Sequence, residues 1–293
     1  MVNSATKQID VSVEPILTVV MPIYNAGRFL RMAVISVLWQ SYTQWELIII
    51  DDGSTDDALQ SIGDIKDPRI KVFKDGKNKG LAIRLNEAIA LAQGRYIARM
   101  DQDDISYPER FFRQIEVLES NNMLDLVAVR AIKITESDML IGELPYAGTH
   151  EEICSAPWRG FYLPHPTWMA KTSWFRKYLY ATPAPYFCED QELLLRSHAK
   201  SLFYTIDDVL FAYRVREVVN LKKQLRTRFA CLKFQVKYFV TAKQLYLIPL
   251  AALNYVLRLG YDFLVLIGLL SMHKGNVDNK AKNNWRHIIE RCQ

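Results

Sequence analysis

Short apolar runs and amphipathic stretches alternate along the N-terminal part of the chain. The apolar runs are rich in β-branched residues at consecutive positions, which is typical of strands buried on both faces. They predict four strands, at residues 17–21, 45–50, 70–73 and 96–100. Helices are predicted between them, at residues 28–41, 54–62 and 81–93. This alternation predicts a parallel sheet with helices on both faces.

Two helix ends are also predicted from local residues. Gly94 follows the helix at 81–93 and fits the position after a helix C-terminus, where a left-handed backbone favours glycine. Further on, Ser106 can cap a helix, Pro108 suits its first turn, and Glu109 completes a capping box. These residues predict a helix that begins directly after Ser106.

The rest of the chain is less regular. Residues 125–215 predict a mixed region, with a helix starting near Glu189 and paired strands around 202–215. From about residue 217 the pattern indicates helices with basic and apolar faces. We therefore expect an α/β body followed by a helical segment.

Polar clusters follow three of the predicted strands. They are residues 22–25 (PIYN), 51–54 (DDGS) and 101–104 (DQDD). Ligands of open α/β sheets bind at the carboxyl ends of the strands. The three clusters are therefore expected to form one site.

The DQDD cluster is a candidate metal site. Crowded carboxylates repel one another, and a hard divalent cation with oxygen ligands relieves that repulsion. Mg²⁺ or Mn²⁺ would also neutralise a diphosphate and make it a better leaving group. On these residues alone, a solvated acidic turn is an equal alternative.

The other two clusters allow a binding and a structural interpretation each. Asp52 can accept hydrogen bonds from a base or ribose, or it can belong to a turn in which Ser54 or Asp56 caps a helix. Tyr24 can stack on a nucleobase, or it can be a core tyrosine at a strand end.

Taken in order, the motifs resemble those of the family 2 glycosyltransferases. The segments VMPIYN, LIIIDDGSTD, NKG…RLNEAI and GRYIARMDQDD match in order and spacing over residues 17–110. Glu189-Asp190, with Arg196 beyond, resembles the acceptor-side helix of that family. The resemblance implies a GT-A fold, an α/β fold with a Rossmann-like mixed sheet and helices on both faces. It also implies inverting transfer from a nucleotide sugar.

The resemblance assigns donor-side roles to matching positions. Pro22 and Tyr24 would border the base, and Asp52 would contact uracil or its equivalent. Asp101 and Asp103 are the D-x-D pair.

Within that pair, Asp101 would face the ribose and the metal, and Asp103 would bind the metal directly, leaving Asp104 structural. Arg84 lies where the family often has a basic residue near the phosphates, at a variable position. A surface helix arginine is the alternative for Arg84.

On the acceptor side, Asp190 would be the general base that takes the hydroxyl proton. Its alternative is a carboxylate favoured at a helix N-terminus. Glu189 would contact the acceptor or the donor sugar. His165, in LPHPT, resembles a segment common in members that build bacterial surface polysaccharides. It would line the acceptor pocket, with a structural histidine as the alternative.

These assignments divide the chain into four parts. We expect an N-terminal extension at 1–15, a nucleotide-sugar-binding half at 16–105, an acceptor-binding half at 106–216, and a basic, apolar helical region at 217–293.

The helical region favours contact with a membrane surface. Residues 215–293 carry 14 Lys and Arg against 4 Asp and Glu. Residues 244–257 are free of charge and residues 263–272 are apolar, but Arg258 and Pro249 interrupt the pattern. Neither piece reaches the roughly 20 apolar residues of a spanning helix, so an interfacial anchor is expected. A helical cap on the domain and a dimer interface are the alternatives.

The cysteines and the N-terminal sequence indicate the cellular compartment. The four cysteines (Cys154, Cys188, Cys231 and Cys292) have no disulfide or zinc spacing, and the N-terminus is polar. A reducing cytosol is therefore expected, at the cytoplasmic face of the inner membrane. The basic tail lacks a nucleic-acid-binding module, so no nucleic-acid partner is expected.

Other classes of protein fit less well. A dehydrogenase needs G-x-G-x-x-G after a strand, and a nucleotidyltransferase needs a Gly-rich basic loop there; PIYN is neither. A non-catalytic nucleotide-sugar-binding or scaffold protein is the remaining alternative. It would be expected to lack Asp103 or Asp190, and this chain has both. Processive synthases carry Q-x-x-R-W, which this chain lacks, so a single transfer is expected.

The expected donor is a UDP-sugar, with GDP- and dTDP-sugars as alternatives. The expected acceptor is a saccharide or lipid-linked intermediate of lipopolysaccharide, O-antigen or capsule.

Overall fold

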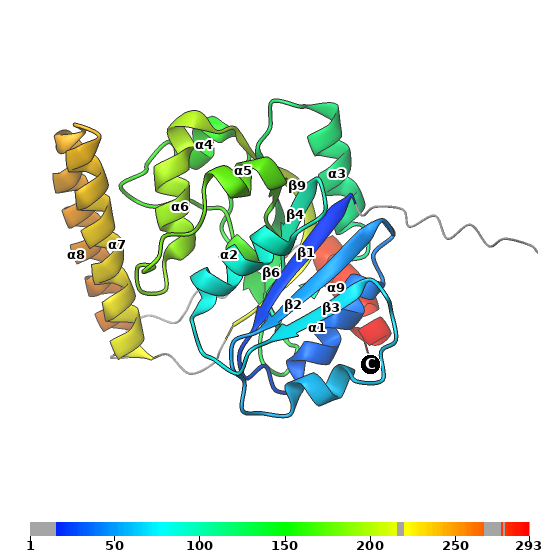
Figure 1. The fold of residues 1–293 in the computed structure, drawn as a ribbon. Helices are drawn as coiled ribbons and strands as arrows, with labels where there is room; N and C mark the ends of the chain where they lie inside the picture. Colours follow the sequence, from blue (N-terminus) through cyan, green and yellow to red (C-terminus); the bar gives the residue numbers. More distant parts are fainter. Residues whose placement is uncertain (1–15, 216–219, 267–276, 278, 293) are drawn as a thin grey trace, which may run out of the picture.

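One mixed sheet forms the centre of the protein (Figure 1). The computed structural model describes residues 16–215, 220–266, 277 and 279–292. The strands of this part are β1 (Leu17–Ile23), β2 (Trp45–Asp51), β3 (Ile70–Lys74), β4 (Tyr96–Arg99), β5 (Ile105–Ser106), β6 (Leu126–Ile134), β7 (Leu140–Glu143), β8 (Met169–Lys171) and β9 (Phe203–Arg214). Their order is β3-β2-β1-β4-β8-β6-β9-β5, and β7 pairs with β6.

Helices cover both faces of this sheet, and a helix pair, α7 and α8, lies outside it (Figure 1). The helices are α1 (Phe29–Leu38), α2 (Leu81–Leu91), α3 (Arg110–Ser120), α4 (His150–Cys154), α5 (Thr172–Lys177), α6 (Glu189–Ser197), α7 (Leu221–Thr241), α8 (Ile248–Leu266) and α9 (Asn279–Cys292). Short 3-10 turns are η1 (Ala58–Ile62), η2 (His165–Thr167), η3 (His198–Lys200) and η4 (Leu245–Leu247). The predicted α/β body with a C-terminal helical segment is therefore present.

Alternation along the strands builds two hydrophobic cores. Val19 and Met21 of β1 pack with α1 and α3 on one face, whereas Val20 packs with α2 and α5 on the other. Successive side chains of a strand point to opposite faces, so a continuous apolar run serves both cores. Each fully buried aliphatic side chain contributes about 1.5–3 kcal/mol, which explains why most positions of the β1 and β2 runs are apolar.

The register of the sheet places the three polar clusters together. β1 runs parallel to β2, with Ile23 opposite Asp51, and parallel to β4, with Val20 opposite Arg99. The carboxyl ends of these strands therefore lie at one edge of the sheet. The predicted clusters lie at these ends: PIYN covers the last two residues of β1, DDGS begins at the last residue of β2, and DQDD follows β4.

The predicted role of Gly94 was wrong. Helix α2 ends at Leu91, with Ala92 extended, before Gly94 is reached. A Cβ at Gly94 would lie 2.5 Å from the backbone nitrogen of Thr18. Glycine is needed there because the chain passes directly against β1, and not because the backbone is left-handed.

The predicted capping box was also wrong. Ser106 belongs to β5, where it pairs with Phe211 of β9, and α3 begins at Arg110 without a side-chain cap. The Glu109 carboxylate instead accepts a hydrogen bond from the Ser41 hydroxyl at 3.0 Å. Residues 203–214 likewise form one long strand, parallel to β6, in place of a pair of strands.

The C-terminal helices differ from the broken pieces that the sequence predicted. Pro249 lies in the first turn of α8, where proline is tolerated, and the helix continues past Arg258. Residues 245–266 form a helical stretch that is long and apolar enough to cross a membrane, judged by length and composition. α8 pairs with α7 beside α6, at one side of the molecule (Figure 1). The end of the predicted second piece, at Met272, lies outside the described residues.

Candidate functional site

Three carboxylates after β4 form an acidic cluster. Ligand oxygens of Asp101, Asp103 and Asp104 all lie within 4.8 Å of one another. Asp104 is buried, and its Oδ1 accepts the backbone N–H of Arg214 at 2.7 Å. Its Oδ2 is buried without a hydrogen-bond partner among the described residues. Burial raises the pKa of Asp104, and the charges of Asp101 and Asp103 raise it further.

This cluster fits a divalent cation. Its donors are carboxylate oxygens, which Mg²⁺ and Mn²⁺ prefer, and the free Oδ2 of Asp104 is a buried acceptor that a cation would satisfy. The predicted pair Asp101 and Asp103 is brought together as expected. Asp104, expected to be structural, holds the Arg214 backbone and also belongs to the cluster.

Arg99 is a site residue that the sequence interpretation missed. It is 1% exposed, and its guanidinium donates to the Asp101 carboxylate. Burial raises the pKa of Asp190, and the positive charge of Arg99 opposes that rise. The signal was present as a single arginine within an apolar strand run.

Gln102 joins the first polar cluster to the third. Its Oε1 accepts the backbone N–H of Tyr24 at 2.6 Å, and its Nε2 donates to the Tyr24 carbonyl at 3.1 Å. The Tyr24 ring is 48% exposed, so the alternative of a core tyrosine is wrong. Pro22 is buried near the end of β1, where it lies opposite Ile50 of β2. The Asn25 N–H donates to Ser54 at 3.0 Å, which adds the second cluster.

Asp52 and Arg84 form a buried ion pair behind these loops. The Asp52 carboxylate accepts from the N–H groups of Lys79 and Gly80 and from Arg84 Nε at 2.8 Å. Arg84 is 2% exposed and also pairs with Asp75. The alternative of a surface arginine is therefore wrong. The pair holds the loop before α2 in place, and its contacts with a nucleotide stay a prediction.

The glycine of the DDGS segment is required by that same loop. Gly53 has φ of +77°, and a Cβ there would lie 2.9 Å from the carbonyl carbon of Lys77. Both the left-handed backbone and the close approach exclude larger residues.

Glu189 and Asp190 begin α6 as two adjacent, half-buried carboxylates. Burial raises the pKa of Glu189 to about 7, with the charge of Asp190 adding to the rise. Gln191 Nε2 donates to Asp190 Oδ2 at 3.2 Å. A carboxylate with a raised pKa is suited to accept a proton near neutral pH.

His165 is buried close enough to Arg99 to feel its charge. Its Nε2 lies 2.7 Å from the Tyr180 hydroxyl, and its ring meets Trp168 edge-on at 4.6 Å. Burial lowers its pKa well below the ordinary value, and the charge of Arg99 lowers it further, so the ring is neutral. Burial raises the pKa of Tyr180, and the charges of Glu189, Asp190 and Asp101 contribute. His165 is thus a satisfied core histidine within the site, and Tyr180 is its missed partner.

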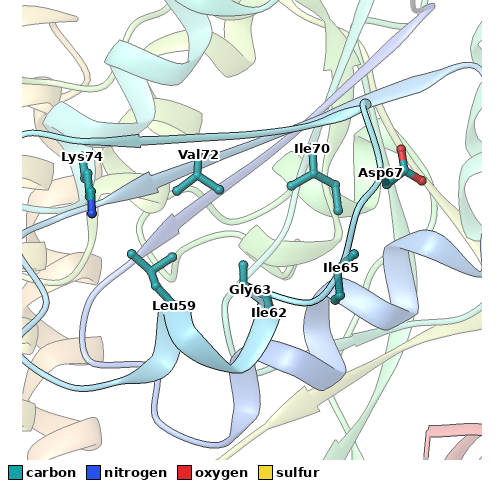
Figure 2. Close-up of a pocket in the computed structure, with 8 residues that line it drawn as sticks. All are labelled: Leu59, Ile62, Gly63, Ile65, Asp67, Ile70, Val72 and Lys74. Carbon is teal, nitrogen blue, oxygen red and sulfur yellow. The ribbon is translucent and has the colours of Figure 1, made fainter.

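A separate groove lies at the outer edge of the sheet, between η1 and β3 (Figure 2). Its walls are mainly apolar: Leu59, Ile62, Gly63, Ile65, Asp67, Ile70, Val72 and Lys74. The carboxylate of Asp67 is bound by Arg69. None of the predicted site residues lines this groove, so we place the candidate site at the acidic cluster.

Comparison with known sequences identifies related proteins. The family described as "Glycosyl transferase family 2" matches residues 18–179. The chain is 36% identical over 108 residues to the E. coli protein named UDP-Glc:alpha-D-GlcNAc-diphosphoundecaprenol beta-1,3-glucosyltransferase WfgD, covering 37% of this chain and 43% of the relative. It is 35% identical over 144 residues to bifunctional glycosyltransferase pgtA of Dictyostelium discoideum, covering 43% and 19%. The chain thus matches less than half the length of these curated relatives.

Solved structures share the fold. S. aureus TarS 1–349, in complex with UDP-GlcNAc, has a TM-score of 0.66 at 14% identity, covering 94% of this chain and 80% of that one. The mannosyltransferase PcManGT from Pyrobaculum calidifontis, in complex with GDP-Man and Mn²⁺, has a TM-score of 0.55 at 14% identity, covering 95% and 86%. The predicted GT-A fold is confirmed by these likenesses.

Proposed function

Because this chain belongs to glycosyl transferase family 2, we propose that it transfers one sugar from a nucleotide-sugar donor to an acceptor hydroxyl, with inversion at the anomeric carbon. The observation that carries the proposal is the pairing of two acidic groups around Arg99. One group is Asp101, Asp103 and Asp104 after β4, and the other is Glu189 with Asp190 at the start of α6. The guanidinium of Arg99 bonds to Asp101, and its charge acts on the pKa of Asp104, Glu189 and Asp190. Transfer from a nucleotide sugar uses both groups, because a diphosphate anion leaves the donor and a proton leaves the acceptor hydroxyl.

The donor side would hold a divalent cation, Mn²⁺ or Mg²⁺. Asp101 and Asp103 would bind it, supported by the free oxygen of Asp104. When bound, such a cation supplies positive charge to the departing diphosphate. The protein's own contribution is to hold the three carboxylates in one cluster, with Arg99 fixing Asp101.

The acceptor side would supply the base. An Asp190 oxygen takes the proton of the acceptor hydroxyl while that oxygen forms a bond to the anomeric carbon. The bond from that carbon to the diphosphate oxygen breaks, and the nucleoside diphosphate leaves with the electron pair. The Gln191 side chain orients Asp190, and Glu189 lies beside it to contact the incoming sugar.

The relatives favour particular substrates for this proposal. TarS and PcManGT were solved with UDP-GlcNAc and GDP-Man, and WfgD is named for UDP-glucose and a diphosphoundecaprenol-linked sugar. We take a UDP-hexose or UDP-N-acetylhexosamine as donor and a saccharide or lipid-linked saccharide as acceptor, in surface polysaccharide synthesis. Tyr24, with its exposed ring, would stack on the base.

A donor panel tests the proposal. Purified protein is incubated with UDP-, GDP- and dTDP-sugars, with Mn²⁺, with Mg²⁺ and with EDTA, and released nucleoside diphosphate is measured. We expect metal-dependent release from one donor. If no donor is hydrolysed, and calorimetry also detects no metal-dependent donor binding, the proposal is wrong and a scaffold role takes its place.

A further inference from the structure

Helix α8 presents an apolar face to its surroundings. Among its exposed side chains are Leu250, Leu253, Val256, Leu257, Phe263 and Leu264. Leu253, Val256 and Leu257 are each more than half exposed. Their spacing places them on one side of the helix. A helix of 19 residues is about 28 Å long. The exposed apolar side chains follow one another along this length as one continuous patch, whereas single scattered apolar residues are normal on a protein surface.

The charged side chains of α8 are directed away from that face. Asp262 is 5% exposed and pairs with Arg228 of α7 at 2.6 Å. It also accepts from Gln224 at 2.9 Å. Arg258 donates to the carbonyl of Arg159 at 2.9 Å. Asp262 thus joins α8 to α7, and Arg258 joins α8 to the loop at Arg159.

The partner helix α7 adds positive charge. Lys222, Arg226, Lys233 and Lys237 are exposed, and their spacing places them on one stripe of the helix together with Phe229, which is 60% exposed. Long basic side chains next to apolar ones are typical of helices at the surface of an anionic bilayer.

We propose that the α7–α8 hairpin docks on an anionic lipid bilayer, with α8 lying in the interface plane and its apolar face against the acyl region. A spanning α8 is disfavoured because it would carry Asp262 and Arg258 away from their partners and into hydrocarbon. A second copy of the chain is disfavoured because two basic α7 stripes would repel each other in a symmetric pair. Negative phospholipid headgroups complement both features.

Docking would bring the acceptor side of the site near the membrane. Lys223 of α7 lies 3.6 Å from the centre of the Phe187 ring, and Arg226 lies 4.2 Å from that of Tyr186. Tyr186 and Phe187 lie just before α6, which begins with Glu189 and Asp190. The docking inference stands on the hairpin alone and does not depend on the proposed transfer, so the two can fail separately.

Vesicle flotation of the full chain tests the inference. The vesicles contain phosphatidylcholine alone, or with about one-third phosphatidylglycerol. We expect binding to the anionic vesicles that falls at least tenfold in Leu253→Glu/Leu257→Glu and about tenfold or more in Lys233→Gln/Lys237→Gln. Met123→Glu serves as the control, because Met123 is an apolar residue outside the hairpin that is 71% exposed, more than Leu253 or Leu257. It should bind like the wild type.

Three results would overturn the inference. One is binding that neither double variant changes, with circular dichroism showing each variant folded. Another is a lipid-free dimer, by light scattering, that Leu253→Glu/Leu257→Glu dissociates while the wild type does not bind vesicles. The last is bound protein whose α8 is protected from protease and resists alkaline extraction, which would indicate a span.

Discussion

The Arg99 guanidinium donates a hydrogen bond to the carboxylate of Asp101, two residues further along the chain. Arg99 closes β4 and is almost completely buried. Its charge also opposes the rise that burial causes in the pKa of Glu189 and of Asp190. One buried cation therefore acts on the acidic residues of both sides of the site.

Removing that charge should alter the pH dependence of turnover. In Arg99→Met the pKa of Asp190 rises, so the acid limb of kcat/KM moves to higher pH, and turnover at pH 7 falls about tenfold or more. Arg99→Lys keeps the charge and should keep the position of the limb. Steady-state rates between pH 5 and 9 measure this. A profile for Arg99→Met that superimposes on the wild type contradicts the role of Arg99.

The ionisation of Glu189 should lower the free energy of unfolding at alkaline pH. Burial, with the charge of Asp190, raises its pKa from 4.5 to about 7. Between these values the folded state binds more protons than the unfolded state. Its contribution to stability is therefore full below pH 4.5 and is lost as pH rises through about 7.

Glu189→Gln cannot ionise, so it escapes this loss. We expect it to raise the free energy of unfolding by about 1–3 kcal/mol at pH 8 and to change it little at pH 5. Urea unfolding in EDTA at the two pH values measures both. An equal difference at the two pH values would exclude the ionisation of Glu189 as the cause.

Arg84 should act mainly on stability. It is buried and bonded to Asp52, Asp75 and Glu87, so Arg84→Leu leaves uncompensated charge and should lower the free energy of unfolding by about 3–5 kcal/mol. Arg95→Leu, at an arginine whose side chain is 62% exposed and paired with Glu119, is the control and should cost about 0–1 kcal/mol. If Arg84→Leu keeps normal stability and only raises the donor KM, a phosphate contact explains Arg84 better.

The sequence predicted what local pattern determines. Apolar runs identified β1, β2 and β4 because these strands are buried on both faces, whereas β3 is a partly exposed edge strand. The polar segments at the ends of β1, β2 and β4 converge because these strands are parallel. Asp101 and Asp103 could therefore be placed in one cluster from the order of the strands and the motif that follows β4.

The features that the sequence did not predict depend on contacts between residues far apart in the chain. Ser106 has the local pattern of a helix cap, but its backbone pairs with Phe211, more than a hundred residues later. Tyr180 carries no local signal, because only the folded chain brings it to His165. Pro249 locally indicates a break, whereas its place at a helix start depends on where η4 turns the chain.

In the proposed reaction, Asp103 binds the metal on the donor side and Asp190 takes the proton on the acceptor side. Two variants test it together: Asp190→Asn, which removes the base, and Asp103→Ala, which removes a metal ligand. Calorimetric titration with Mn²⁺ and the donor that the panel identifies, beside turnover in the same preparation, is the direct measurement. We expect Asp190→Asn to bind donor as the wild type does and to lose turnover by about 10²–10⁴-fold, and Asp103→Ala to lose metal-dependent binding. Near-normal turnover in either variant would contradict the account.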